Sequence, residues 1–106
     1  MPIGPSARNT AMTAGFFVVT TSRFDRELKK LATQHPRLPA LYQGSIGILK
    51  VDPYNRSRRY LIKKLHAVPA GEGQYRIRAG RFRFRYDIEG QMVYLKACSL
   101  RRENTY

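Results

Sequence analysis

The stretch YRIRAGRFRFRY, residues 75–86, decides the fold of this chain. Side chains alternate between the two faces of a β-strand, and Ala79-Gly80 offers a turn between two such strands. One face then collects the apolar and aromatic side chains: Tyr75, Ile77, Phe82, Phe84 and Tyr86. The other face collects five arginines: Arg76, Arg78, Arg81, Arg83 and Arg85. The pattern predicts a hairpin that buries its aromatic face and gathers its arginines on the opposite face.

The five arginines are the first candidate site. Like charges on neighbouring strands repel one another unless an anion neutralises them. Guanidinium groups bind phosphate through paired hydrogen bonds and stack on nucleobases. The pattern therefore favours nucleic-acid binding, and the alternative is a solvated outer face of a basic sheet. Solvated faces usually mix the two signs of charge, whereas this face has no acid before Asp87.

The rest of the chain supplies two helices and further strands around this hairpin. An amphipathic helix is predicted over 23–34 with Ser22 as its N-cap, and a second helix over 38–50. Strands are predicted over 16–20, 60–66, 74–78, 81–88 and 92–98. The order β-α-α-β-β-β-β predicts an α+β domain. Its two N-terminal helices should pack on a mainly antiparallel sheet of four to five strands.

The charge balance points to an anionic partner. Twenty Lys and Arg face seven Asp and Glu in 106 residues, a formal net charge of +13. Residues 1–55 hold a net +4 and residues 56–106 a net +9. Such a field attracts polyanions, among them nucleic acid, an anionic membrane or an acidic protein. No apolar run reaches the length of a membrane span, so a membrane is not expected, and the single cysteine fits a reducing cytoplasm.

Outside the arginines the sequence holds no conventional catalytic set. One cysteine and two histidines cannot make a metal cluster, and nothing resembles a phosphate-binding glycine loop. Neither a metal nor a cofactor is therefore expected. His66 is a candidate general base beside the basic strands, whereas His35 is expected to be a helix-end residue. Cys98 is expected to fill the core rather than to act as a nucleophile.

Three motifs in the second half of the chain resemble the RelE/ParE toxin superfamily. They are IKKLH (62–66), GQYRIRAGRFRFRYDI (73–88) and SLRRENTY (99–106), and the resemblance covers residues 16–106. It implies a RelE-like fold and a toxin of a type II toxin–antitoxin system, which a co-expressed antitoxin holds inactive. RelE-like members cut messenger RNA in the ribosomal A site, whereas ParE-like members inhibit DNA gyrase.

The resemblance also carries over a set of RNase residues by position. It implies catalytic roles for Arg76, Arg78, Arg83, Arg102 and Tyr106. Arg76 and Arg83 would hold the phosphate oxygens while the 2′-hydroxyl attacks. Arg102, or Arg101 beside it, would stabilise or protonate the leaving oxygen, and Tyr106 would stack on a base. Further RNA-binding residues are expected at Lys63, Lys64, Arg81, Arg85 and Arg101.

The chain departs from the family pattern at two of these positions. RelE-like enzymes often have lysine where this chain has Arg76 and Arg78. Arginine stays protonated at any usable pH and is a poor general base, so these residues are not assigned proton abstraction from the 2′-hydroxyl. Stabilisation of the transition-state phosphate is mainly electrostatic, and arginine supplies it as well as lysine does.

Three other functions remain open from the sequence. A ParE-like chain would inhibit DNA gyrase without nuclease activity, although Arg102 and Tyr106 favour the RNase. A catalytically inactive member would bind RNA or regulate its own operator, and the arginines at 76 and 78 keep this alternative open. An unrelated RNA-binding domain would turn its sheet aromatics outward to stack on bases, whereas these are needed for the core. The expected partners are thus messenger RNA, the ribosome and an acidic antitoxin.

Residues 1–14 are expected to be a disordered tail because they lack periodic apolar positions, and the toxin domain is expected to span 15–106. Deletion of 1–14 should leave the melting temperature unchanged within about 2 °C, since ~1 kcal/mol of lost stability would lower it by more than that. Thermal unfolding followed by circular dichroism measures the change. A drop of several degrees would show that the tail packs on the domain.

Overall fold

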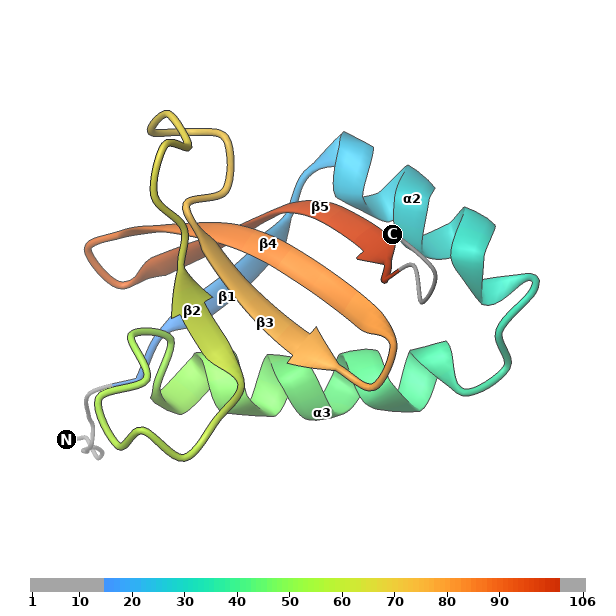
Figure 1. Cartoon of the computed structure of the whole chain (residues 1–106), viewed down its shortest axis with the longest axis horizontal. Coiled ribbons are helices and arrows are strands. Elements are labelled where there is room, and N and C mark those ends of the chain that lie inside the picture. The colour runs from blue at the N-terminus through green and yellow to red at the C-terminus, as the bar shows by residue number, and fades with distance from the viewer. Residues whose placement is uncertain (1–14, 102–106) are drawn as a thin grey trace, which may run out of the picture.

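The protein is described over residues 15–101 by a computed structural model. Two helices and five strands follow one another in the predicted order (Figure 1). Their bounds are β1 Phe17–Thr20, α2 Ser22–Ala32, α3 Leu38–Val51, β2 Ile62–Lys64, β3 Tyr75–Ala79, β4 Phe82–Glu89 and β5 Met92–Leu100. The predicted α+β class is confirmed. Neither helix in this part of the chain is long and apolar enough to cross a membrane.

The five strands form one mixed sheet in the order β1-β5-β4-β3-β2. Strands β2 to β5 pair antiparallel in succession, and β1 lies parallel to β5 at one edge. A tight hairpin cannot join parallel strands, and the rest of the domain lies between β1 and β5 along the chain. The first and the last strand therefore complete the sheet together.

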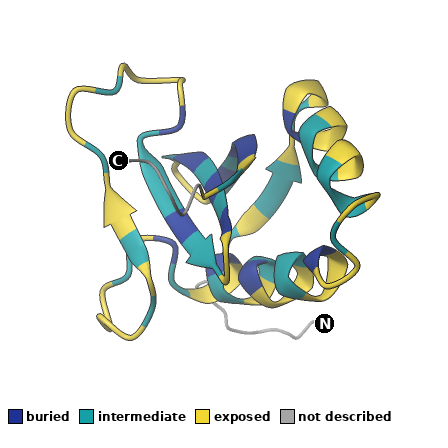
Figure 2. Cartoon of the chain, turned by 45° about the vertical axis from the view of Figure 1, so that its right-hand side comes forward, coloured by how far each residue is buried: buried dark blue, intermediate teal, exposed yellow. Residues whose placement is uncertain are grey.

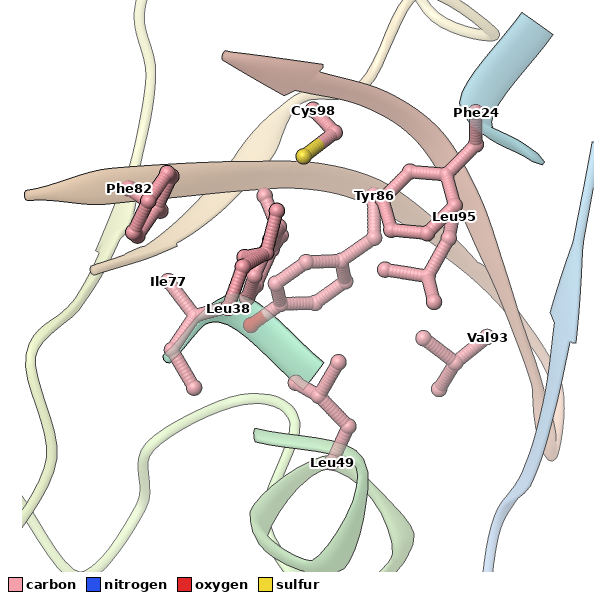
Figure 3. Packing of buried hydrophobic residues seen from close by; sticks show 10 residues of the cluster. Phe24, Leu38, Leu49, Ile77, Phe82, Tyr86, Val93, Leu95 and Cys98 are labelled. Atoms are coloured by element: carbon pink, nitrogen blue, oxygen red, sulfur yellow. The ribbon is translucent and has the colours of Figure 1, made fainter. Parts of the chain in front are cut away.

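The core lies between the sheet and the two helices. Phe24 of α2 is fully buried, and its ring centroid lies 5.7 Å from that of Tyr42 in α3 and 5.9 Å from that of Phe84 in β4. One side chain thus joins both helices to the sheet. Figure 3 shows the buried cluster, which comprises Phe24, Leu38, Leu49, Ile77, Phe82, Phe84, Tyr86, Val93, Leu95 and Cys98. The aromatic face of residues 75–86 meets the helices, as the alternation predicted.

The N-cap of α2 is Thr21, not Ser22 as predicted from the sequence. The Thr21 hydroxyl accepts a hydrogen bond from the backbone N–H of Phe24 (3.3 Å) and donates one to the carbonyl of Leu95 in β5 (2.9 Å). Either hydroxyl could satisfy the free N–H groups of the first turn. The additional bond to the sheet selects Thr21, and a local sequence pattern does not contain that contact.

Helix α2 also covers the part of β5 that β1 leaves unpaired. β1 pairs with β5 only from Met92 to Leu95, and beyond it the backbone N–H of Cys98 donates to the carboxylate of Glu27 (2.8 Å). A covered edge cannot pair with another chain. Burial, and after it the charge of Glu27, raises the pKa of the Cys98 thiol to about 12. The thiol is therefore protonated at neutral pH, in agreement with its predicted place in the core.

Phe24→Ala should lower the free energy of unfolding by about 3–5 kcal/mol, because it removes the ring that joins both helices to the sheet. Phe17→Ala is the matched control: Phe17 is 64% exposed on β1, and its loss should change that free energy by less than about 0.5 kcal/mol. Urea denaturation of both variants measures the difference. Equal effects would mean that the helices dock through other contacts.

Candidate nucleic-acid interface

The arginines of β3 and β4 lie opposite one another on the sheet face that points away from the helices. The register pairs Arg76 with Arg85 and Arg78 with Arg83, and the intervening pairs face the core. Lys63 of β2 lies beside Arg76 and extends the first row. Two rows of cations therefore cross neighbouring strands on one face, as the alternation predicted.

Three of these arginines lie close together, and each has a buried nitrogen without a hydrogen-bond partner among the described residues. Within residues 15–101, the Nε atoms of Arg76, Arg78 and Arg83 are buried and have no hydrogen-bond partner. Burial lowers the pKa of Arg76, and the charges of Arg83, Arg78 and Arg101 lower it further. Desolvation and repulsion thus both disfavour the charged form of Arg76, and a bound anion would offset them. We call Arg76, Arg78 and Arg83 the arginine cluster.

Arg85 and Arg81 differ from these three, although the sequence pattern grouped all five arginines. Arg85 donates from Nε to the carbonyl of Gly73 (3.1 Å) and from Nη2 to the carbonyl of Glu72 (2.7 Å). Its guanidinium group thus holds the loop between β2 and β3. Arg81 lies in the β3–β4 turn instead of a strand, and its carbonyl accepts the backbone N–H of Arg101 at 2.6 Å.

Asp87, the first acid on this face, acts on the same loop. Its buried carboxylate accepts the backbone N–H of Gly73 (3.0 Å) and that of Gln74 (2.9 Å). Gly73 has a φ of +85°, and a Cβ at this position would come within 2.9 Å of the Cβ of Arg85. Glycine is therefore required where the loop crosses β4. The negative charge of Asp87 binds backbone and fixes the loop at one end of the arginine rows.

The other predicted site residues do not all lie beside the arginine cluster. Lys64 lies on the opposite face from Lys63, with its Nζ 5.7 Å from the ring centroid of Tyr75. Arg101 is close enough to the cluster for its charge to lower the pKa of Arg76. Arg102 and Tyr106 lie outside the described residues, so their roles remain predictions.

The two histidines lie outside the strands that carry the arginines. His35 packs its ring against Phe82 at a centroid distance of 5.2 Å, near the end of α2 as predicted. His66 is exposed in the loop that follows β2. Among residues 15–101, no three His, Cys, Asp or Glu side chains come close enough to hold a metal ion.

A hollow of about 200 Å³ opens beside the arginine cluster. Its lining residues are Tyr60, Leu61, Ile62, Lys63, Arg76 and Arg78. The sequence predicted one strand over 60–66, but β2 spans only Ile62–Lys64, so Tyr60 and Leu61 belong to the loop before it. Neither residue was a predicted site residue. The sequence feature that could have identified them is their position: an aromatic and an aliphatic residue directly follow the basic segment Arg56–Arg59.

The arrangement is suited to a phosphodiester. Guanidinium groups from two paired strands can each give parallel hydrogen bonds to phosphate oxygens. They remain protonated, so they can stabilise negative charge that develops on a phosphate but cannot remove a proton. The arginine cluster can therefore bind RNA or DNA backbone and act as an electrostatic catalyst.

The domain resembles chains in two solved toxin–antitoxin complexes. One is from the RelBE2 complex of Mycobacterium tuberculosis, with 23% identity and a TM-score of 0.63 over 83% of this chain and 100% of that one. The other is from the archaeal RelE–RelB complex of Pyrococcus horikoshii OT3, with 20% identity and a TM-score of 0.60 over 83% of this chain and 97% of that one. No protein-family model and no curated protein matches the sequence. These likenesses show the fold, and this chain has the RelE fold that its motifs predicted.

Proposed function

We propose that this protein is the toxin of a type II toxin–antitoxin pair and cleaves messenger RNA on the ribosome as a metal-independent endoribonuclease. One observation carries the proposal. Arg76, Arg78 and Arg83 stand together on a RelE fold, and within residues 15–101 their buried Nε atoms have no partner. A bound polyanion would offset the repulsion between these positive charges. The two similar solved structures are toxin–antitoxin complexes, which supports the toxin class.

The arginine cluster would act on the phosphate during an internal transesterification. The 2′-oxygen forms a bond to phosphorus and the bond to the 5′-oxygen breaks, which leaves a 2′,3′-cyclic phosphate and a 5′-hydroxyl. Arg76 and Arg83, on neighbouring strands, would hold the non-bridging oxygens and stabilise their charge in the transition state. The guanidinium groups stay protonated, so the proton of the 2′-hydroxyl would pass to water, and the leaving 5′-oxygen would take its proton from water. The predicted role of Arg102 that agrees with this is to stabilise the charge on the leaving oxygen.

An acidic antitoxin is the proposed partner in the cytoplasm. Residues 56–106 carry a net charge of +9, and the arginine cluster repels itself when no anion is bound. An acidic helix or strand across this face would neutralise the cluster and exclude RNA from it. RNA and antitoxin would then compete for the same three side chains.

Expression of the chain alone should stop bacterial growth, and co-expression with an acidic protein encoded beside it should restore growth. The reason is that the antitoxin would cover the arginine cluster before RNA reaches it. Colony counts under separate inducible promoters measure the effect, with Arg83→Ala as a folded but non-toxic control. Normal growth in the presence of abundant folded wild-type protein would contradict the toxin assignment.

Arg83→Ala should lower the rate of mRNA cleavage on translating ribosomes about a hundredfold to a thousandfold, the usual effect of losing one preorganised charge contact to a transition state. The free energy of unfolding should change by less than about 0.5 kcal/mol, because the side chain points away from the core. Primer extension maps the cuts and urea denaturation reports stability. Arg26→Ala, at an exposed position on α2, is the matched control and should keep full activity.

Two outcomes would replace this function with another. If the wild-type protein leaves translated mRNA whole and blocks supercoiling by DNA gyrase, it is a ParE-like gyrase inhibitor. If it binds RNA and cuts none on the ribosome, the arginine cluster is a binding surface without catalytic activity.

A further inference from the structure

We propose that Tyr60 and Leu61 form a nucleobase-binding wall beside the arginine cluster, so that the hollow between them holds one nucleotide of single-stranded RNA. The inference rests on the proposed function, because it assigns the place of the nucleotide whose phosphate the cluster binds. It goes further in naming residues that set how tightly the base itself is held.

The lining of the hollow divides by chemistry. Lys63, Arg76 and Arg78 supply positive charge, whereas Tyr60 and Leu61 supply an aromatic ring and an aliphatic side chain. A nucleotide divides in the same way, into a phosphate and a flat apolar base. The volume of about 200 Å³ is enough for one base, and a base that stacks on a protein side chain must be splayed out of a helix, as in a single strand. The hollow therefore fits an unpaired nucleotide, with its phosphate against the cations and its base against the wall.

The exposure of the wall agrees with this role. Leu61 is 63% exposed, and Figure 2 shows that β2 and the loops on either side of it are mostly exposed. A single exposed leucine has no meaning by itself. Here it adjoins a tyrosine and two arginines at the mouth of one hollow. Aromatic side chains beside a basic groove are a recurring means of binding single-stranded nucleic acid, because every base has a face that stacks.

The wall is fixed in place by hydrogen bonds to its backbone. The Asn55 side chain accepts the backbone N–H of Tyr60 (3.1 Å) and donates to the carbonyl of the same residue (3.0 Å). The carbonyl of Leu61 accepts the backbone N–H of Arg78 (2.9 Å). The wall is thus bonded directly to β3, the strand that carries two of the three arginines of the cluster. A wall ordered before RNA arrives loses less conformational entropy on binding.

The test uses two fluorescent hexamers of equal charge. One is a single-stranded 2′-O-methyl oligoribonucleotide, which cannot undergo 2′-hydroxyl attack, and the other is its abasic counterpart with the same phosphates. Anisotropy titrations of the full chain are run at one fixed salt concentration, because phosphate contacts weaken steeply with salt. The wild-type protein should bind the oligoribonucleotide about tenfold to a hundredfold more tightly than the abasic oligomer, as expected for one stacked base.

Five variants distinguish the contribution of the wall to binding from that of the positive charges. Tyr60→Ala should remove most of the preference for bases and leave binding of the abasic oligomer unchanged, whereas Tyr60→Phe should keep the preference. Leu61→Ser should lower the preference by a smaller factor, and its exposed position allows it to fold. Val51→Ser, at another exposed apolar residue (65% exposed, at the end of α3), is the matched control and should change nothing. Arg78→Ala should weaken binding of both oligomers by the same factor.

The outcomes that overturn the inference differ from those that overturn the function. Equal affinity of the wild-type protein for the two oligomers would show that no base is held, and RNA binding through the arginine cluster would stand. If the wild-type protein binds neither oligomer, both the RNA-binding function and the nucleobase-binding wall are wrong. If folded Tyr60→Phe loses as much preference as Tyr60→Ala, the hydroxyl contacts the RNA and the stacking wall is wrong.

Discussion

The register between β3 and β4 is the constraint on which the rest of the structure depends. It places Tyr75 against Tyr86, with stacked rings 5.6 Å apart, and Ile77 against Phe84 on the core side. Full burial of one such side chain stabilises the fold by about 1.5–3 kcal/mol, whereas a pair of like charges on opposite strands costs only about 0.2–1 kcal/mol. Burial therefore decides the register, and the arginines must meet on the other face. A slip of one residue would drive them into the core.

This balance links stability to the proposed partners. An anion that binds the folded chain at a hundred times its dissociation constant adds about 2.7 kcal/mol to the stability of that chain. RNA and an acidic antitoxin would each supply this gain through Arg76, Arg78 and Arg83, because either would offset the repulsion between these neighbouring charges. In the proposed function, competition for the cluster would follow directly from its positive charge. No movement of the fold is needed to explain control by an antitoxin.

The strands could be predicted from the sequence because alternation is a local property. The predicted strands 74–78 and 81–88 lie within one residue of β3 and β4. The faces occupied by Arg76, Arg78, Arg83 and Arg85 followed from them, whereas Arg81 lies in the turn. The sheet face on which an arginine lies does not determine where its guanidinium group ends. Arg85 turns to the backbone of a loop twelve residues earlier in the chain, and the hollow depends on the bonds from Asn55 to Tyr60. These contacts depend on where loops return to the sheet, which no local pattern of residue types contains.

The same loops support the hollow beside the arginine cluster, which lies at the β2 edge of the sheet. Strand β2 has three residues and few core contacts to hold it, so the segments on either side need other supports. Before β2 the support is Asn55, and the buried hydroxyl of Tyr86 anchors the start of that loop by donating to the carbonyl of Pro53 (2.7 Å). After β2 the supports are Asp87 and Arg85. Polar groups bonded to backbone thus replace apolar burial along this edge. A surface built in this way stays ordered while its cations remain accessible to a polyanion, which a more deeply buried strand would not allow.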